Sequence, residues 1–500
     1  MSLNMNAAKF STLTFVLILL SCFASASNAG NDNAGITSSS TNHTNDDQTT
    51  LDQKQAHIAN TELSSNLSFK PSSKPSSLID IYNKAIANDP TLASALSANK
   101  AAQELIEQGK ALYRPTLNFN AGVTATKSSI AFNNVTLDRF PRIAGKAGFE
   151  GYNYEFEARQ PIYRKQNLVQ MEQSFTQVSI ADKQYHLTQQ NLILRVTQAY
   201  FNVLIAQDNI ELIRTQKTAI LSQLEQAKVT FEVGTTTITD VNEAQARFDL
   251  IIAQEIEAIN TYQVAQYEIE QITGELPAEL AAVKNDFKAN QPNFKLKDLL
   301  NAANQNNLNI AIQQDNFKLA EQNVAFNKAA HLPIVDAVGN YTNNYTNGGL
   351  NGFGNEFNST NIGLQLQIPL YQGGLISSRV RQSILELQRS KEDIQVVRRQ
   401  TDLDTQRAFL NLTSNSAQIK ALEQALISSQ SQLDSTNLGY EVGVRINIDV
   451  LNAQQQLFSA KRDLLQARYN YLVNTIRLKT ATGLVSEIDL IDINSQLVTN

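Results

Sequence analysis

Apolar residues recur at heptad spacing in two long stretches of the chain. One stretch lies between Pro161 and Pro277 and the other follows Pro369, and neither contains a proline. An apolar repeat of about 3.5 residues sustained over many turns specifies helices packed as coiled coils, although an ordinary bundle of long helices stays open as an alternative. The three seams consist of Leu192, Val196, Ala199, Val203, Ala206, Ile210, Ile213, Lys217, Ile220, Leu224, Ala227 and Phe231; of Val241, Ala244, Phe248, Ile251, Glu255, Ala258, Tyr262, Ala265, Ile269 and Ile272; and of Val450, Ala453, Leu457, Ala460, Leu464, Ala467, Tyr471, Asn474, Leu478 and Ala481.

Four shorter segments alternate apolar and polar residues, which indicates β-strands. Strands of about ten residues with one apolar and one polar face are typical of a membrane barrel, and a soluble antiparallel sheet with one wet face is the alternative. Four strands cannot close a barrel, and lipid does not tolerate an open sheet edge, so a membrane barrel would need strands from several chains. The segments are 117–126, 152–159, 362–370 and the less regular 334–345, and the aromatic residues expected at the lipid interface are Phe119, Tyr152, Tyr154, Phe156 and Tyr163.

The two halves of the chain repeat each other. Phe231-Glu232-Val233-Gly234 matches Tyr440-Glu441-Val442-Gly443 at an offset of 209 residues (440 − 231), and Asp240-Val241 matches Asp449-Val450 at the same offset. A constant offset means that the halves share element lengths. Each half is therefore predicted to contain a helix, two strands and a long helical hairpin, with Asn- and Gly-rich loops between the strands at about 128–149 and 346–360.

The N-terminus has the pattern of an export signal. Lys9 precedes an apolar run over Leu13–Leu20, and Ala24-Ser25-Ala26 offers a cleavage site, although Leu19-Leu20-Ser21-Cys22 leaves open a lipoprotein site at Cys22. The Ser-, Thr-, Asn- and Asp-rich residues that follow cannot bury enough apolar surface to order, which predicts a flexible leader. The predicted domains are 1–26, the signal peptide; 27–77, the leader; 78–274, the first repeat; 275–293, a linker; 294–483, the second repeat; and 484–500, a C-terminal tail.

Composition excludes several classes of function. The formal net charge of −6 lacks the basic excess of a nucleic-acid-binding protein. One Cys and four separated His provide neither a disulfide framework nor a spacing suited to metal ligands. The stretch Gly348–Gly354 is rich in Gly but lacks the Lys of a phosphate-binding loop. We therefore predict no catalytic, metal or cofactor site and no enzymatic activity.

A set of short motifs, in order and in a duplicated frame, resembles the TolC-type outer-membrane channel-tunnel proteins over essentially all of residues 78–485. The resemblance implies a mainly α protein with a membrane β-barrel: a homotrimer in which three chains pool their strands into a twelve-stranded barrel, continued by a twelve-helix α-barrel tunnel across the periplasm. The motifs are Arg114-Pro115-Thr116-Leu117, Ala199-Tyr200-Phe201-Asn202-Val203-Leu204, Phe231–Gly234 with Thr239-Asp240-Val241, His331-Leu332-Pro333, Pro369-Leu370-Tyr371-Gln372-Gly373-Gly374, and Tyr440–Ala453 with Arg468–Leu472.

The resemblance also implies partners and a location. The channel would be the exit duct of tripartite efflux pumps or type I secretion systems, completed by a periplasmic adaptor and an inner-membrane transporter driven by protons or ATP. It would lie in outer-membrane lipid, with its helical tunnel in the periplasm. The sequence does not decide between drugs and proteins as cargo. The rival interpretation is a non-channel periplasmic coiled-coil adaptor or structural protein, which would explain the heptads but not the amphipathic strands.

The residues that the resemblance implies for a gated entrance lie where the hairpins turn. Asp449 matches an aspartate of the entrance constriction, whereas Asn452 stands at a second such aspartate and weakens the negative ring. Glu243, the repeat counterpart of Asn452, would partly restore that charge. The expected latch residues are Thr239, Asp240, Tyr440 and Arg445, and the hairpin turns expected to face the adaptor are Gly234, Thr235, Gly443 and Val444. From the residues alone, Asp240 and Asp449 are equally explained as helix N-caps.

Overall fold

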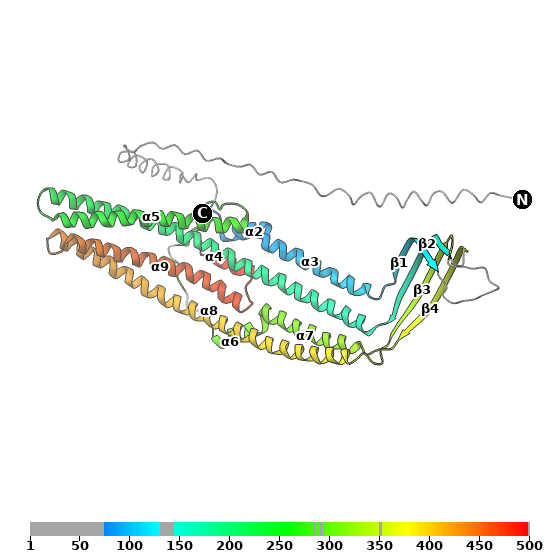
Figure 1. Ribbon diagram of the computed structural model, residues 1–500. Helices are drawn as coiled ribbons and strands as arrows, with labels where there is room; N and C mark the ends of the chain where they lie inside the picture. Colours follow the sequence, from blue (N-terminus) through cyan, green and yellow to red (C-terminus); the bar gives the residue numbers. More distant parts are fainter. Residues whose placement is uncertain (1–74, 131–144, 285–286, 290–293, 350–352, 499–500) are drawn as a thin grey trace, which may run out of the picture. The chain divides into compact units, whose positions relative to one another are not determined.

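The computed structural model describes residues 75–130, 145–284, 287–289, 294–349 and 353–498 (Figure 1). These residues lie in one compact unit that begins at Lys74. The predicted signal peptide and nearly all of the predicted leader lie outside the described residues. The elements of the first half are α2 (Leu78–Asn88), α3 (Pro90–Ala111), β1 (Thr116–Ile130), β2 (Gly145–Tyr163), α4 (Lys165–Glu232) and α5 (Ile238–Thr273). Those of the second half are α6 (Leu296–Asn306), α7 (Leu308–Ala329), β3 (Ile334–Thr346), β4 (Asn355–Gln367), α8 (Leu375–Glu441) and α9 (Asn447–Ala481), followed by α10 (Glu487–Asn494).

The element order repeats as the sequence predicts, except that each half begins with two helices instead of one. Asp89 ends α2 and caps α3, because its side chain accepts hydrogen bonds from the backbone N–H groups of Thr91 and Leu92 at 3.3 and 3.1 Å. Asn307 separates α6 from α7 in the same way, accepting from the Asn309 N–H at 2.9 Å. One polar side chain thus terminates a helix and starts the next.

The four strands form one antiparallel sheet in the order β1-β2-β3-β4. The register aligns Phe119 with Phe156, Phe156 with Tyr341, and Tyr341 with Thr360. Because side chains alternate between faces, the apolar members of all four strands share one face, as the sequence predicts. Phe119 and Phe156 pack there with ring centroids 4.6 Å apart. The other face carries mainly polar residues, among them Asn118 on β1 and Gln367 on β4.

The predicted ends of β1, β2 and β4 are wrong, whereas β3 runs over Ile334–Thr346, within one residue of the predicted 334–345. β1 continues to Ile130 and β2 begins at Gly145, inside the predicted loop 128–149. β4 begins at Asn355 within the second predicted loop and ends at Gln367, before the predicted Leu370. The reason is that the ladder is made by backbone groups, so it extends through Asn, Ser and Gly residues that carry no apolar alternation.

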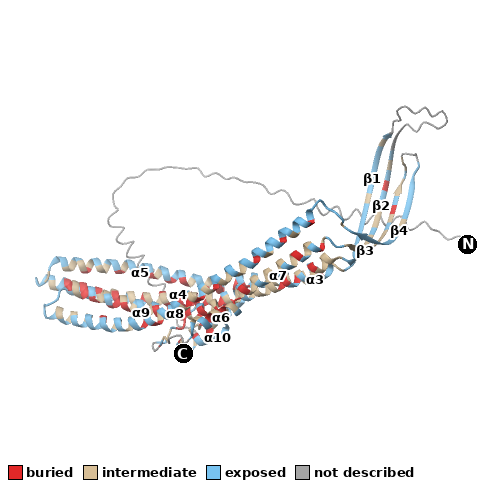
Figure 2. Ribbon diagram, turned by 90° about the horizontal axis from the view of Figure 1, so that it is seen from below, coloured by how far each residue is buried: buried red, intermediate tan, exposed pale blue. Residues whose placement is uncertain are grey.

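The long helices pack in the order α5-α4-α9-α8, as two antiparallel hairpins joined through α4 and α9 (Figure 1). The buried residues follow the predicted seams, among them Leu192, Leu224, Ile251 and Leu464 (Figure 2). The two charged residues of the predicted seams pair with each other, because Lys217 on α4 donates a hydrogen bond to Glu255 on α5. Burial alone would raise the pKa of Glu255, but the hydrogen bonds from Lys217 and Arg214 outweigh it and lower that pKa.

The main apolar core gathers around the middle of α4. Tyr200 is fully buried, and its hydroxyl donates to the Ala281 carbonyl at 2.8 Å. Ala281 belongs to the segment predicted as a linker, and Leu497, also fully buried in this core, to the predicted tail. Both segments therefore pack into the core. The apolar residues of the linker follow no helical or strand period, whereas Leu490 and Ile493 of the tail lie on the buried face of α10.

Candidate functional site at the hairpin ends

Both long hairpins turn at a glycine in the left-handed conformation. Gly234 has φ of 77° and Gly443 has φ of 75°. The Thr235 N–H bonds to the Thr230 carbonyl at 2.9 Å, and the Val444 N–H bonds to the Gly439 carbonyl at 2.8 Å. These bonds satisfy carbonyls at the ends of α4 and α8, as in other glycine-terminated helices. The duplicated Glu-Val-Gly motif thus forms the same turn twice.

At the first turn, Asp240 organises the start of α5. Its carboxylate accepts hydrogen bonds from the hydroxyls of Thr236 and Thr237 at 2.6 and 2.8 Å, and from the Thr237 N–H at 3.1 Å. These bonds, first that from Thr236, lower the pKa of Asp240. Asp240 occupies the third helical position while Thr237 is the N-cap, so the interpretation of Asp240 as an N-cap is wrong. Thr239 is exposed beside it.

The second turn places Arg445 and Asp449 together at the start of α9. Arg445 Nη1 lies 3.7 Å from Asp449 Oδ2, and the Ile446 N–H donates to the same oxygen at 3.4 Å. Asp449 is the third residue of α9 and not its N-cap, because Ile446 occupies that place. Tyr440 lies half-buried in the last turn of α8. Within the described part of a single chain, Asp240 and Arg445 form their side-chain bonds only inside their own hairpins.

Sequence reasoning missed the polar contacts that join the two hairpins. Gln216 donates to Gln455 at 2.8 Å, and Gln223 donates to Asn447. Both glutamines are 7% exposed, and Asn447 is 3% exposed. Gln216 and Gln223 are one heptad apart on α4, so a search for polar residues repeating at seven-residue spacing could have found this pair.

A further contact joins α5 to α9 at the predicted constriction. Arg247 Nη2 donates to Asn452 Oδ1 at 2.9 Å. Asn452 is exposed, whereas Glu243 and Asp449 are half-buried. The structure therefore places Asn452 against a guanidinium that the sequence analysis did not single out.

Further from the hairpin turns, a pair of titratable side chains lies between α4 and α9. The Tyr469 hydroxyl donates to the Asp208 carboxylate. Burial raises the pKa of Asp208, although the hydrogen bond from Tyr469 works in the opposite direction. Burial and the charge of Asp208 both raise the pKa of Tyr469. The pair is a structural contact inside the helical layer and not an exposed acid–base site.

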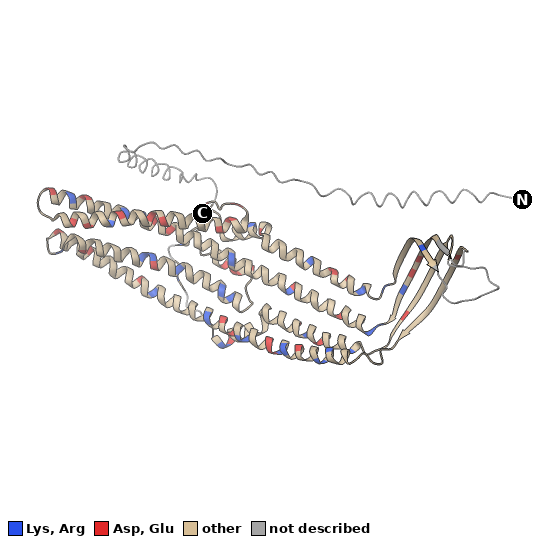
Figure 3. Ribbon diagram, viewed as in Figure 1, with Lys and Arg blue, Asp and Glu red and all other residues tan. Residues whose placement is uncertain are grey.

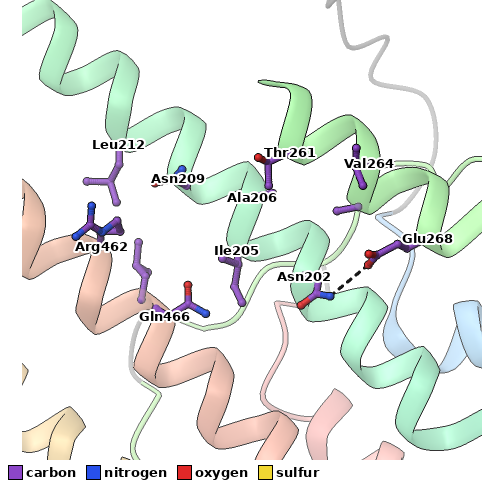
Figure 4. Close-up of a pocket in the computed structure, with 12 residues that line it drawn as sticks. Asn202, Ile205, Ala206, Asn209, Leu212, Thr261, Val264, Glu268, Arg462 and Gln466 are labelled. Carbon is purple, nitrogen blue, oxygen red and sulfur yellow. Dashed lines mark hydrogen bonds between the residues drawn. The ribbon is translucent and has the colours of Figure 1, made fainter. Parts of the chain in front are cut away.

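A groove of about 370 Å³ lies between α4, α5 and α9 (Figure 4). Ile205, Leu212 and Val264 give it an apolar wall, and Arg462 and Gln466 line its α9 side. Asn202 donates to Glu268 across its end at 3.3 Å. Elsewhere in the described residues, no group of three or more His, Cys, Asp or Glu side chains is arranged to hold a metal ion.

Charged residues are spread along the helices and become sparse on the sheet (Figure 3). On the sheet, the large apolar side chains of the shared face are exposed in the single chain: Val123 is 85% and Ile362 is 90% exposed. No helix in the described ranges combines the length and the apolarity needed to cross a membrane. A sheet with one apolar and one polar face and two open edges, continued by long helical hairpins, defines a subunit of an outer-membrane channel.

Comparison with known proteins agrees with this class. The chain matches the family model described as outer membrane efflux protein over residues 81–275 and 299–484, and it belongs to that family. It is 34% identical to outer membrane protein TolC of Vibrio cholerae, with 84% of this chain and 93% of that protein covered. It is 30% identical to the alkaline protease secretion protein AprF of Pseudomonas aeruginosa, with 83% of this chain and 85% of the relative covered.

The solved structures give the same fold. The Campylobacter jejuni CmeC outer membrane channel superimposes with a TM-score of 0.69 at 16% identity, covering 86% of this chain and 94% of that one. The relatives are channel proteins and not enzymes. This chain is accordingly an outer-membrane channel protein with its helices in the periplasm, and the rival interpretation of a non-channel adaptor or structural protein is not favoured.

Proposed function

We propose that three copies of this chain assemble into one gated duct for efflux and type I secretion. The observation that carries this proposal is the open sheet. β1 and β4 each pair on one side only, and their exposed apolar face requires lipid while their edges require partners. Three sheets of four strands joined edge to edge would form a closed twelve-stranded barrel, which satisfies both requirements.

The helical layer supports the same assembly. α5 and α8 are its edge helices, as β1 and β4 are the edges of the sheet. On α8, Val396, Leu403 and Leu410 repeat at heptad spacing and are 65%, 40% and 61% exposed. An apolar heptad stripe left open in one chain is expected to pack against a neighbouring helix. The α5 helix of the next copy would close a ring of twelve helices.

The proposed gate lies at the hairpin ends. Asp449 and Asn452, with Glu243 opposite, would line the constriction, and Thr239, Asp240, Tyr440 and Arg445 would latch it between hairpins of neighbouring copies. Asp240 and Arg445 are suited to this role because both are charged side chains beside a turn. Their present bonds inside each hairpin could be exchanged for bonds between hairpins without burying an unpaired charge.

The proposed partners are a periplasmic adaptor and an inner-membrane transporter. The turns at Gly234, Thr235, Gly443 and Val444 would meet the adaptor, because they are the exposed ends of both hairpins. The names of the relatives support two kinds of cargo, since one family name refers to efflux and one relative to protease secretion. The energy for transport would come from the inner-membrane partner.

The assembly is tested by the mass of the purified protein in detergent. We expect a heat-dissociable complex of three chains. Leu410→Glu should shift the population towards single chains, because it places a carboxylate in the proposed α8 interface. Asn411→Glu, on the adjacent exposed position, is the matched control and should remain assembled. A wild-type protein that is monomeric in detergent and in membranes would contradict the proposal.

A further inference from the structure

The surface of the helical layer near the hairpin ends carries one guanidinium without a counter-ion. Arg247 hydrogen-bonds to Asn452 at 2.9 Å, and within the described residues no carboxylate lies within 4.0 Å of its nitrogens. Glu243 precedes Arg247 by one helical turn on α5, a spacing that permits an ion pair. Arg247 forms its bond to the neutral amide of Asn452 instead. The guanidinium of Arg247 is therefore held by a neutral acceptor and makes no direct ion pair.

The negative charge at the same level is already paired. Asp449, one turn from Asn452 on α9, lies 3.7 Å from Arg445 in the turn that precedes α9. Asp449 and Asn452 share one face of α9 because they are three residues apart. α4 packs between α5 and α9, and the Arg247 side chain of α5 reaches Asn452 on α9. Arg247 therefore lies on the surface of the layer that also carries Asn452 and Asp449. Each chain thus brings two cations, Arg247 and Arg445, to the surface that carries Asp449.

We infer that Arg247 is a selectivity-determining residue of the entrance: it offsets the negative charge of Glu243, beside an Asp449 already paired with Arg445, and so admits anionic cargo. The inference rests on the proposed function, because it requires this surface to line the constriction. Arg247 lies at the level of Asn452, and Asn452 is three residues beyond Asp449 on α9. In the trimer, the three Arg247 side chains would therefore lie about 4.5 Å further along the pore axis than the Asp449 carboxylates. Asn452 holds each guanidinium by one nitrogen and leaves its other donors free for carboxylate or phosphate groups.

The geometry also explains why Glu243 does not restore the negative ring that the sequence analysis expected of it. Glu243 and Arg247 lie on one face of α5, so their charges would cancel at the distance of a permeating ion. The entrance would then carry Arg445 with Asp449, and Arg247 with Glu243. Neither pair leaves an excess of negative charge, and a pore of this kind discriminates weakly between small cations and anions.

The test is the reversal potential of single channels in a planar bilayer under a KCl gradient, with the full-length assembled protein. We expect a wild-type permeability ratio of K⁺ to Cl⁻ near one. Arg247→Gln should raise that ratio by about twofold or more, because a unit charge several ångströms from the ion path alters local ion concentrations by about that factor in water. Asn452→Asp should shift the ratio in the same direction, and Arg247→Lys should leave it near the wild-type value.

Lys84→Gln is the matched control, because it removes one positive charge at the opposite end of α5, where Lys84 pairs with Glu275. It should leave the ratio unchanged. An unchanged ratio in a conducting Arg247→Gln channel would overturn the inference and leave the channel function intact. So would an equal shift in Arg247→Lys, since it would assign the effect to the bond with Asn452 and not to the charge. An assembled wild-type protein without any conductance would contradict the channel function and the inference together.

Discussion

Asp208 shows how a single half-buried residue makes the stability of this protein depend on pH. Its carboxylate lies between α4 and α9 and accepts a hydrogen bond from Tyr469. Burial raises its pKa in the folded state above the value of about 3.9 expected in an unfolded chain. The folded state therefore binds more protons than the unfolded state between those two values, and the free energy of unfolding falls as pH rises through that window.

Asp208→Asn should consequently stabilise the helical layer at neutral pH, because the amide accepts the Tyr469 bond without the cost of burying a charge. The gain should shrink as pH falls, because the raised pKa lets Asp208 take up a proton in the folded state before it does so in the unfolded chain. Denaturant-induced unfolding followed by circular dichroism at pH 4.5 and pH 7.5 measures it. A gain that is larger at pH 4.5 would refute the assignment.

The turn after α8 depends on the backbone conformation of Gly443. Its φ of 75° lies in the left-handed region, and a Cβ added there would meet no atom within 4 Å. Gly443→Ala should therefore cost about 1 kcal/mol from backbone strain alone. Gly363→Ala in β4 is the control, because a Cβ there also meets nothing within 4 Å and the backbone is extended. Equal unfolding free energies for the two variants would count against a strain effect at the turn.

The roles of the charged residues at the turns show what sequence can and cannot provide at this scale. The repeat correctly identified Gly234 and Gly443 as turn residues because a positive φ is a local requirement. The alternative interpretation of Asp240 and Asp449 as N-caps is wrong, because each stands three residues after the N-cap of its helix. The bond from Arg247 to Asn452 joins residues 205 positions apart (452 − 247), and no local pattern encodes it.

At the scale of elements, the seam of each hairpin accounts for most of the packing. Leu224 on α4 is 2% exposed and belongs to a cluster with Ile220, Ile251 and Leu451. The heptad pattern predicted this burial because it depends only on spacing along one helix. The ends of the strands and the packing of the predicted linker and tail were not predictable in this way. Backbone ladders and scattered apolar residues such as Leu280 leave no periodic signal.

Leu224→Ala should destabilise the hairpins by about 2–5 kcal/mol, because it removes a buried side chain and leaves a cavity. Leu221→Ala, on the same helix but 41% exposed in the single chain, should cost less than half as much. Unfolding by denaturant, monitored through the helical signal, distinguishes the two. A larger loss in Leu221→Ala would mean that the seam assignment on α4 is wrong.

At the scale of the whole molecule, the open edges of the sheet and of the helical layer fall at corresponding places. β1 and β4 end the sheet, and α5 and α8 end the layer. The internal repeat explains this correspondence, because each half supplies two strands and one hairpin in the same order. The family match identifies the class of channel.

We propose that the assembled chain is a pore closed by latches at its hairpin ends. Single-channel conductance in a planar bilayer measures this, comparing the wild type with Arg445→Ser combined with Tyr440→Phe. A small wild-type conductance should rise several-fold in the double variant, because two side-chain contacts that hold the hairpins closed are removed. An assembled wild-type protein that passes no ions, or a double variant with unaltered conductance, would contradict it.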